Sequence, residues 1–291
     1  MKNILFILFI SYLLMSCDAL LTIEEREVFS VKTPSVQIFL CPQDTVISAK
    51  VWGTNPTVGT GSKISNPIVS NATIILTNEM NQRIELKWNK TFLNYTAPSK
   101  GFDVMVGKRY DMKLTTPEGD NLTAFCIIPQ QIDKKGISLI KTKVEPSPFS
   151  DGTEYFIQWK DFPNQKNYYS VFILNYFETL SPKEIRLEGD GAMYGIEDDK
   201  VKDGEVTTPK SWQLKERQSG SNGPYQYVRY QTLFVCHTDE SYAKFHKSLD
   251  EIKRNNDNPF AEPSRLYTNV KGGFGVFAGY NRTEYKVDKL P

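Results

Sequence analysis

The stretch SVQIFLCPQDTVISAKVW, residues 35–52, decides the fold class. Apolar and polar side chains largely alternate along residues 35–41 and again along 45–52. Alternation with a period of two is typical of a half-buried β-strand, and the short Pro42-Gln43-Asp44 break between the two runs predicts a hairpin. The folded body therefore begins near Pro34 with an antiparallel β pair.

The same pattern continues downstream in short runs that turn residues separate. Strands are expected at residues 72–77, 83–88, 94–96, 110–115 and 122–128, with turns at 78–82 and 117–120. About seven short strands before Pro129 indicate an immunoglobulin-like sandwich. Residues 53–66 are rich in Gly, Thr, Ser and Asn, and we expect them to form an exposed loop. We predict an N-terminal immunoglobulin-like β domain over residues 34–145.

A second set of strands follows the Pro146-Ser147-Pro148 break. Strands are expected at residues 153–159, 168–177, 225–236 and 276–280. Residues 168–177 are largely apolar at both the odd and the even positions, which predicts that both faces of this strand are buried. A helix is expected over about 239–254, with Asp239 as N-cap and its apolar side chains in the core: Tyr242, Phe245, Leu249 and Ile252. We predict a C-terminal β domain over 149–291, and a mainly β fold of two sandwich-like domains with one short helix.

The N-terminus has the features of an export signal. Lys2 precedes an apolar run from Ile4 to Met15, which is shorter than the roughly 20 residues that a membrane-spanning helix needs. Residues 1–16 therefore form a predicted signal peptide. The motif Leu14-Met15-Ser16-Cys17 resembles a lipobox. It predicts lipidation of Cys17 with fatty acyl chains such as palmitate, followed by a tether over residues 17–33. The alternatives are an ordinary signal peptide or an uncleaved anchor.

Composition limits the partners. The chain has 35 Lys plus Arg against 34 Asp plus Glu, so no general attraction to nucleic acid is expected. Beyond Cys17 the cysteines are Cys41, Cys126 and Cys236. One disulfide between Cys41 and Cys126 and three buried free thiols are both compatible with this odd number.

Motifs for catalysis and for cofactors are weak. The only histidines, His237 and His246, are expected in packing or surface positions, and their spacing gives no zinc motif. A Gly-x-Ser-x-Gly nucleophile elbow is missing from the sequence. The acidic stretch 188–205 is expected to be a solvated loop, with calcium binding as the alternative. Gly272-Gly273-Phe274-Gly275 lacks the Lys-Ser/Thr ending of a phosphate loop. We therefore assign no catalytic residue, metal or cofactor.

Several segments together resemble one family. The tail from Asn258 to Tyr280, which contains Gly272-Gly273-Phe274-Gly275-Val276-Phe277, resembles the end of a Bacteroidota lipoprotein family called domain of unknown function 4249. Further segments are similar to its signatures: Asp161-Phe162-Pro163, Asn167-Tyr168-Tyr169, residues 198–204, Ser241-Tyr242, residues 72–74 and residues 107–110. The resemblance implies an envelope lipoprotein with an N-terminal immunoglobulin-like or carboxypeptidase-regulatory-like domain. Members often lie beside TonB-dependent outer-membrane transporters, and the family implies no enzymatic activity and no site residues.

One short motif indicates a modification. Asp44-Thr45-Val46 resembles the O-glycosylation signal used in the same phylum, which makes Thr45 a candidate acceptor. The pattern is only three residues long and occurs often by chance.

These features together favour a binding protein over an enzyme. We expect a lipid-anchored accessory component of the outer membrane that works with a TonB-dependent transporter, on a side of that membrane that the sequence leaves open. Loops such as 53–66 and 189–204 are its expected contact surfaces. The alternatives are a secreted hydrolase whose site forms only in space and a structural or adhesive surface protein.

Overall fold

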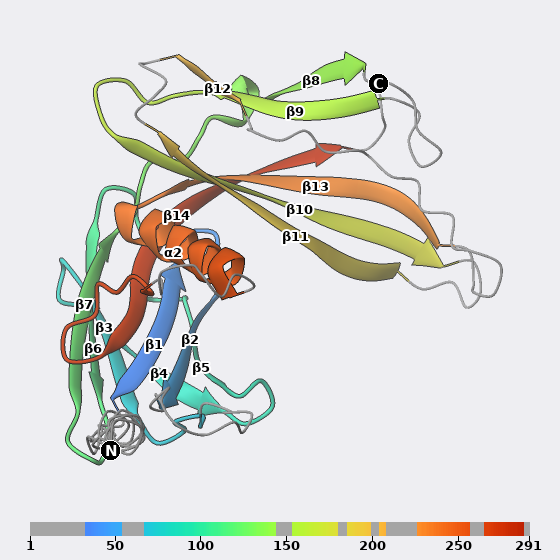
Figure 1. Cartoon of the computed structure of the whole chain (residues 1–291). Coiled ribbons are helices and arrows are strands. Elements are labelled where there is room, and N and C mark those ends of the chain that lie inside the picture. Colours follow the sequence, from blue (N-terminus) through green and yellow to red (C-terminus); the bar gives the residue numbers. More distant parts are fainter. Residues whose placement is uncertain are drawn as a thin grey trace, which may run out of the picture.

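The computed structural model describes residues 33–53, 67–143, 153–179, 185–198, 204–207, 226–256 and 265–287 (Figure 1). The predicted signal peptide, the lipobox with Cys17, the tether and most of the 53–66 loop lie outside the described residues. Within the described part, the predicted mainly β, sandwich-like fold with a helix near the C-terminal end is confirmed.

The first seven strands follow the order expected from the sequence. They are β1 (Pro34–Leu40), β2 (Val46–Gly53), β3 (Thr73–Asn78), β4 (Arg83–Asn89), β5 (Asn94–Pro98), β6 (Arg109–Thr115) and β7 (Asn121–Ile127). The hairpin predicted over residues 35–52 is confirmed, because β1 and β2 pair antiparallel. Alternate residues of both strands are buried, so the period of two in the sequence marks the face that meets the core.

Strand β4 passes from one layer of this body to the other. Its residues 83–86 pair with β3 and its residues 87–89 pair with β5. One layer thus contains β1, β2, β5 and the end of β4, and the other contains the start of β4 with β3, β6 and β7. Fully buried side chains from both layers, such as Ile38, Ile74 and Leu114, fill the space between them.

The second half is also layered. It contains β8 (Ser138–Lys143), β9 (Thr153–Lys160), β10 (Asn167–Thr179), β11 (Ile185–Asp198), β12 (Glu205–Thr207), β13 (Gln226–Thr238) and β14 (Phe274–Val287). Strands β12, β9 and β8 form a small sheet that lies over the long strands in Figure 1. Trp159 of β9 packs with Val171 of β10 and Val235 of β13 in a second core.

Strand β14 belongs to both halves. Its first part pairs parallel with β1, from Ser35 opposite Phe274 to Leu40 opposite Gly279. Its second part pairs antiparallel with β13, starting where Tyr280 lies opposite Thr238. Among the described residues this makes one continuous eleven-stranded sheet, in the order β11-β10-β13-β14-β1-β2-β5-β4-β3-β6-β7. One strand thereby holds the two halves in a fixed relation.

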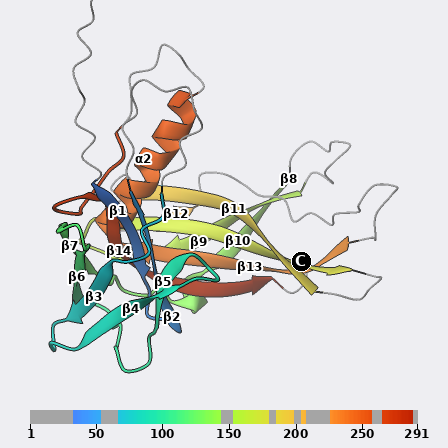
Figure 2. The same ribbon diagram turned by 90° about the horizontal axis from the view of Figure 1, so that it is seen from below.

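Helix α2 (Glu240–Asn256) follows β13 directly, as predicted. Tyr242 and Phe245 are buried against Val276 and Ala278 of β14. Figure 2 shows the helix beside β1 and β14, with β10, β11 and β13 extending away. The apolar face of the helix is therefore core packing at the place where the two halves join.

Burial of β10 on both faces is only partly confirmed. Tyr169, Val171 and Ile173 are buried in the second core. On the other face Tyr168 is buried, and its hydroxyl donates a hydrogen bond to Glu240 of α2 at 2.9 Å. Phe172 on the same face is only partly buried. Burial on the second face is thus complete at the start of the strand, next to the helix.

Two sequence-based expectations need correction, and one strand was not expected. The acidic stretch 188–205 is not a loop over residues 188–198, because these belong to β11, which pairs with β10 along its length. Its glycines and carboxylates obscure the strand pattern, while the long edge of β10 offers backbone partners. Strand β8, which the sequence did not reveal, pairs with β9. The closing strand is also longer than the expected 276–280, because its polar second half pairs with β13.

Candidate functional site

The predicted acceptor Thr45 lies in the turn between β1 and β2. Its residue is exposed, and its backbone carbonyl accepts a hydrogen bond from the Ser99 N–H at 2.9 Å. The hydroxyl therefore sits on a turn that the backbone holds in place. Glycosylation of Thr45 stays a prediction. Cys17, Leu14, Met15 and Ser16 lie outside the described residues.

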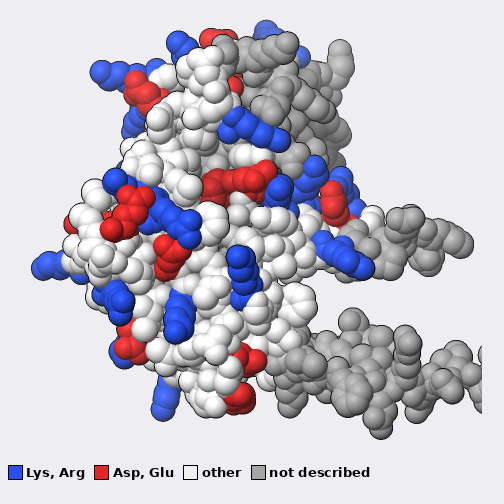
Figure 3. Space-filling view, turned by 90° about the vertical axis from the view of Figure 1, so that its left-hand side faces the viewer, with Lys and Arg blue, Asp and Glu red and all other residues white. Residues whose placement is uncertain are grey.

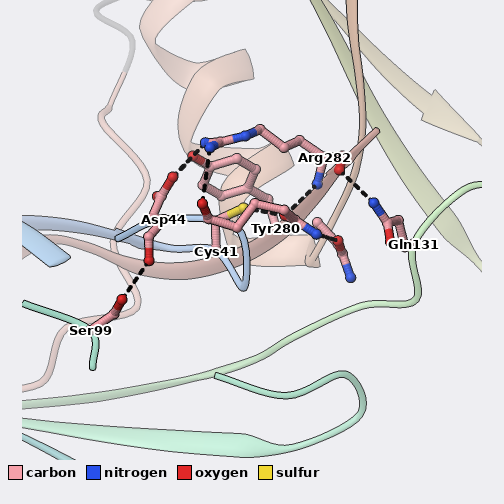
Figure 4. Close-up of polar contacts among 8 residues, drawn as sticks. Cys41, Asp44, Ser99, Gln131, Tyr280 and Arg282 are labelled. Atoms are coloured by element: carbon pink, nitrogen blue, oxygen red, sulfur yellow. Dashed lines mark hydrogen bonds and ion pairs between the residues drawn. The ribbon is translucent and has the colours of Figure 1, made fainter. Parts of the chain in front are cut away.

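A polar cluster, which we call the junction cluster, joins this turn to the middle of β14 (Figure 4). Arg282 Nη1 donates to Asp44 Oδ1 at 2.5 Å, and each side chain is about one quarter exposed, at 27% and 25%. Arg282 Nη2 donates to the Gln43 carbonyl at 3.3 Å. An ion pair this far removed from water is less screened than one on an open surface. It connects positions 238 residues apart in the chain.

Amide side chains extend the junction cluster to the segment after β7. Gln43 Nε2 donates to Asn281 Oδ1 at 2.7 Å, and Asn281 Nδ2 donates to the Pro129 carbonyl at 3.1 Å. Gln131 Nε2 donates to the Arg282 carbonyl at 2.9 Å. Asn281 is 1% exposed, so its amide needs these partners. The network thus binds the β1–β2 turn, the 129–131 segment and β14 to one another.

The remaining contacts of Asp44 are also internal. Tyr280 donates its hydroxyl to Asp44 Oδ2 at 3.4 Å, and Ser99 donates to the Asp44 carbonyl at 2.7 Å. The Cys41 thiol donates to Gln43 Oε1 at 2.8 Å, and burial raises the pKa of this thiol. With both carboxylate oxygens engaged, the arrangement is suited to holding the two halves in register.

Of the two alternatives for the cysteines, the Cys41–Cys126 disulfide is not formed in the structure. Cys41, Cys126 and Cys236 are free and buried, and burial raises the pKa of Cys126 and of Cys236 well above the ordinary thiol value. The other alternative, three buried free thiols, describes the structure.

The signature residues near position 161 form one hydrogen-bonded unit at the β9–β10 turn. Asp161 is buried, and its Oδ1 accepts from Asn167 Nδ2 at 2.9 Å and from the Phe162 N–H at 2.9 Å. Tyr169 also donates its hydroxyl to the same oxygen. A buried carboxylate with several donors fixes the turn that starts the long strand β10.

His237 packs beside this unit. Its ring stacks on Phe162 with centroids 4.8 Å apart, and its Nδ1 donates to the Gln130 carbonyl at 3.0 Å. Burial lowers the pKa of His237 to about 4, against the opposing effect of that hydrogen bond. The imidazole is therefore neutral at pH 7 and links β13 to the segment that connects the two halves.

The second histidine, His246 of α2, lies among aromatic rings. It stacks on Phe39 of β1 at 5.3 Å between centroids and lies 4.4 Å from Tyr242. Burial lowers its pKa to about 4. Both histidines therefore occupy packing positions, 237 on a strand and 246 on a helix.

Asp239 caps helix α2 and also holds β14. Its Oδ1 accepts from the Tyr242 N–H at 2.8 Å and its Oδ2 from the Gly279 N–H at 2.7 Å. Its own N–H donates to the Gly279 carbonyl at 2.9 Å. Burial raises the pKa of Asp239 to about 7, although the backbone donors oppose this shift. The predicted N-cap is confirmed, and the cap has a second role that the sequence did not reveal.

Asn269 of the tail signature uses its side chain to form the two backbone hydrogen bonds that a neighbouring strand would form with β14. Its Oδ1 accepts from the Phe277 N–H at 3.0 Å, and its Nδ2 donates to the Phe277 carbonyl at 2.7 Å. Nearby, Lys271 and Thr123 exchange backbone hydrogen bonds at 2.8 and 3.0 Å. Residues 269–271 thus lie between β14 and β7 and close the first sandwich.

The outer face of β3, β6 and β7 carries charges of both signs. Figure 3 shows basic and acidic side chains interleaved on this side of the molecule. Arg109 pairs with Asp111 at 2.6 Å, and its guanidinium lies 4.0 Å from the ring centroid of Phe125. This pattern agrees with the near-zero net charge of the chain.

Two kinds of feature are absent from the residues that the structure describes. In that part of the chain no three His, Cys, Asp or Glu side chains gather in a way that could hold a metal ion. The helices described there include none long and apolar enough to cross a membrane.

Comparison with known proteins now identifies the family. The model of "Domain of unknown function (DUF4249)" matches residues 32–286. The chain belongs to the DUF4249 family. A search of curated proteins gave no match. The match covers the helix and all the strands described above except the last residue of β14, so the resemblance predicted from the sequence is confirmed for the family itself.

In this DUF4249 chain several signature residues of the described part serve internal contacts. Asp161, Asn167 and Tyr169 bond to one another, and Asn269 bonds to β14. Nothing in the sequence pattern indicates the pairing of Asp44 with Arg282. An isolated arginine in a polar strand is an ordinary surface feature, and only the parallel pairing of β1 with β14 brings it near the turn.

Proposed function

We propose that this DUF4249 protein is a lipid-anchored binding component of the cell envelope that works with an outer-membrane TonB-dependent transporter. The observation that carries the proposal is the internal use of the signature side chains Asp161, Asn167, Tyr169 and Asn269. They link strands, turns and the helix into one rigid body, which leaves recognition to the surface.

Other features support the anchor and the partner. The lipobox Leu14-Met15-Ser16-Cys17 supplies a site for lipid attachment, and more than one acyl chain gives stable anchoring. The transporter is supported by the family resemblance, since members often lie beside such transporters. On this proposal the protein binds a cargo and presents it to the transporter, which takes the cargo up.

The test is affinity purification of the full-length lipoprotein from its native membranes, with mass spectrometry of the proteins that accompany it. A Cys17→Ala variant is the matched control, because it leaves the described body unchanged and removes the lipid attachment site. Stoichiometric recovery of a TonB-dependent transporter with the parent and not with the control is the expected result. Repeated recovery of the protein alone would contradict the proposal.

A further inference from the structure

The end of the first sandwich where β1 begins carries exposed apolar side chains. Phe92 and Leu93 at the tip of the β4–β5 hairpin are 70% and 53% exposed, Phe274 is 49% exposed and Ile68 is 43% exposed. We call these four residues the apolar rim. Exposed phenylalanine and leucine at a loop tip lose favourable burial energy in water, and such groups commonly mark a contact surface.

Strand register places the rim at one end of the body. Pro34 at the start of β1 lies opposite Gly53 at the end of β2, and Ile68 forms a bridge with the neighbouring Trp52. Asn89 lies opposite Asn94 at the end of the β4–β5 hairpin. Because β5 pairs with β2, this hairpin points in the direction in which β2 ends. This end faces the viewer in Figure 2.

The same end receives the chain from Cys17. There are 34 − 17 = 17 Cα steps between Cys17 and Pro34, which span at most about 60 Å when fully extended. A lipid on Cys17 therefore keeps this end of the sandwich within reach of the bilayer. The exposed side chains at the rim are those that gain free energy by entering its interfacial region.

We propose that the apolar rim contacts the lipid bilayer and orients the body on the membrane. The inference rests on the proposed function, because it takes Cys17 as the lipid anchor. Phe92 and Leu93 enter the interface, while the exposed Lys90 beside them keeps its ammonium group at the level of the headgroups. Anchor and rim together are two points of attachment, which fix the orientation of a body that the tether alone leaves free.

The opposite end of the sandwich supplies a matched control. Met80, in the turn after β3, is 53% exposed. Since the strands run about 20 Å from end to end, Met80 lies away from the membrane when the rim touches it. A Phe92→Cys variant and a Met80→Cys variant can each be labelled with an environment-sensitive NBD fluorophore. The native thiols Cys41, Cys126 and Cys236 are buried and stay unlabelled, which labelling of the parent protein checks.

The experiment places each labelled, lipidated full-length protein in phosphatidylethanolamine and phosphatidylglycerol vesicles. The expected result is a blue shift with increased emission for the label at position 92, quenching of that label by spin-labelled lipids, and neither change at position 80. Water-like emission from position 92, or equal shifts at both positions, would overturn the proposal. A shift at 92 that appears only after a transporter is added to the vesicles would also overturn it and would assign the rim to a protein partner.

Measuring the intact mass of the same samples distinguishes a failure of this inference from a failure of the proposed function. A sample without the lipid on Cys17 contradicts the proposed anchor. A lipidated sample with position 92 in water contradicts only the role of the rim. As a second readout, a Phe92→Ser and Leu93→Ser double variant should unfold at the same urea concentration as the parent, because both side chains are exposed. When bound to vesicles, the double variant should also be cleaved faster than the parent by added protease, because its body is no longer held against the bilayer. An unchanged cleavage rate would count against contact between the rim and the membrane.

Discussion

The carbonyl oxygen of Val36 lies 1.9 Å from the point where a Cβ on Gly275 would sit. Gly275 also has φ +108°, a backbone conformation that side chains disfavour. The close approach arises because β14 lies directly beside β1 in parallel pairing, with Gly275 opposite Val36. The glycine in the Gly272–Phe277 signature therefore allows the strand that connects the two halves to take its place.

A Gly275→Ala substitution should be severely destabilising, by about 3 kcal/mol or more, because the new methyl group meets backbone that cannot move aside. Gly101→Ala is the control, since Gly101 has φ +87° with open space around it. It should cost about 1–2 kcal/mol from the backbone conformation alone. Urea unfolding of both variants measures the difference. Equal losses would mean that the close approach of β1 and β14 is absent.

The ion pair between Arg282 and Asp44 should contribute measurably to stability. A double-mutant cycle with Asp44→Ala and Arg282→Ala is expected to give a coupling free energy of about 1–2 kcal/mol, since both groups are largely shielded from water. The pair Arg109–Asp111 has a similar distance, 2.6 Å, but about half of each side chain is exposed. Its cycle should give a coupling near zero. The reverse order of the two couplings would refute the structural role of the junction cluster.

Asp239 should make stability depend on pH. Its folded-state pKa of about 7 lies above the ordinary 3.8 because of burial, so between these values the folded state binds a proton that the unfolded state has released. The contribution of this group to stability is therefore fully present below pH 4 and is lost, by a few kcal/mol, as the pH rises to about 7. His237 and His246, whose pKa values burial lowers to about 4, act in the opposite direction over the same range. Urea midpoints of the parent and of a variant without this carboxyl group, at several pH values in this window, isolate the contribution of Asp239.

An Asp239→Asn variant is the control for that pH dependence. Asparagine cannot ionise, so the variant should gain stability relative to the parent as the pH rises from 4 to 7. Its amide group can accept only one of the two backbone bonds, to Tyr242 or to Gly279, so the variant should be less stable than the parent at low pH. An unchanged pH slope would show that another group titrates.

Thiol titration should report both burial and lipidation. The chain has four cysteines, and Cys41, Cys126 and Cys236 are buried with raised pKa values. The native protein should thus react only slowly with a thiol reagent. After denaturation, the lipidated protein should give three equivalents, because its Cys17 sulfur is a thioether, and the unprocessed chain should give four. Rapid reaction of the native lipidated protein would contradict the buried positions.

Local pattern predicted much of the fold. Alternation along 35–52 predicted the β1–β2 hairpin, and Asp239 with Tyr242 and Phe245 predicted the helix and its buried face. These features depend on residues a few positions apart, where the geometry of strands and helices is fixed by the backbone. The tail signature marked an important segment, but its sequence did not show which strands it meets.

The sequence by itself determined the short strands of the first half, the helix after Asp239 and the family. The tertiary structure decided that β14 joins both halves, that residues 188–198 form the edge strand β11, and that Asp44 meets Arg282. The physical reason is that pairing between strands depends on backbone groups that every residue carries, so side-chain pattern says little about which distant strand becomes the partner. Which strands pair is decided by whether they can pack together without steric clash. At Gly275 only a residue without a side chain allows β1 and β14 to lie side by side.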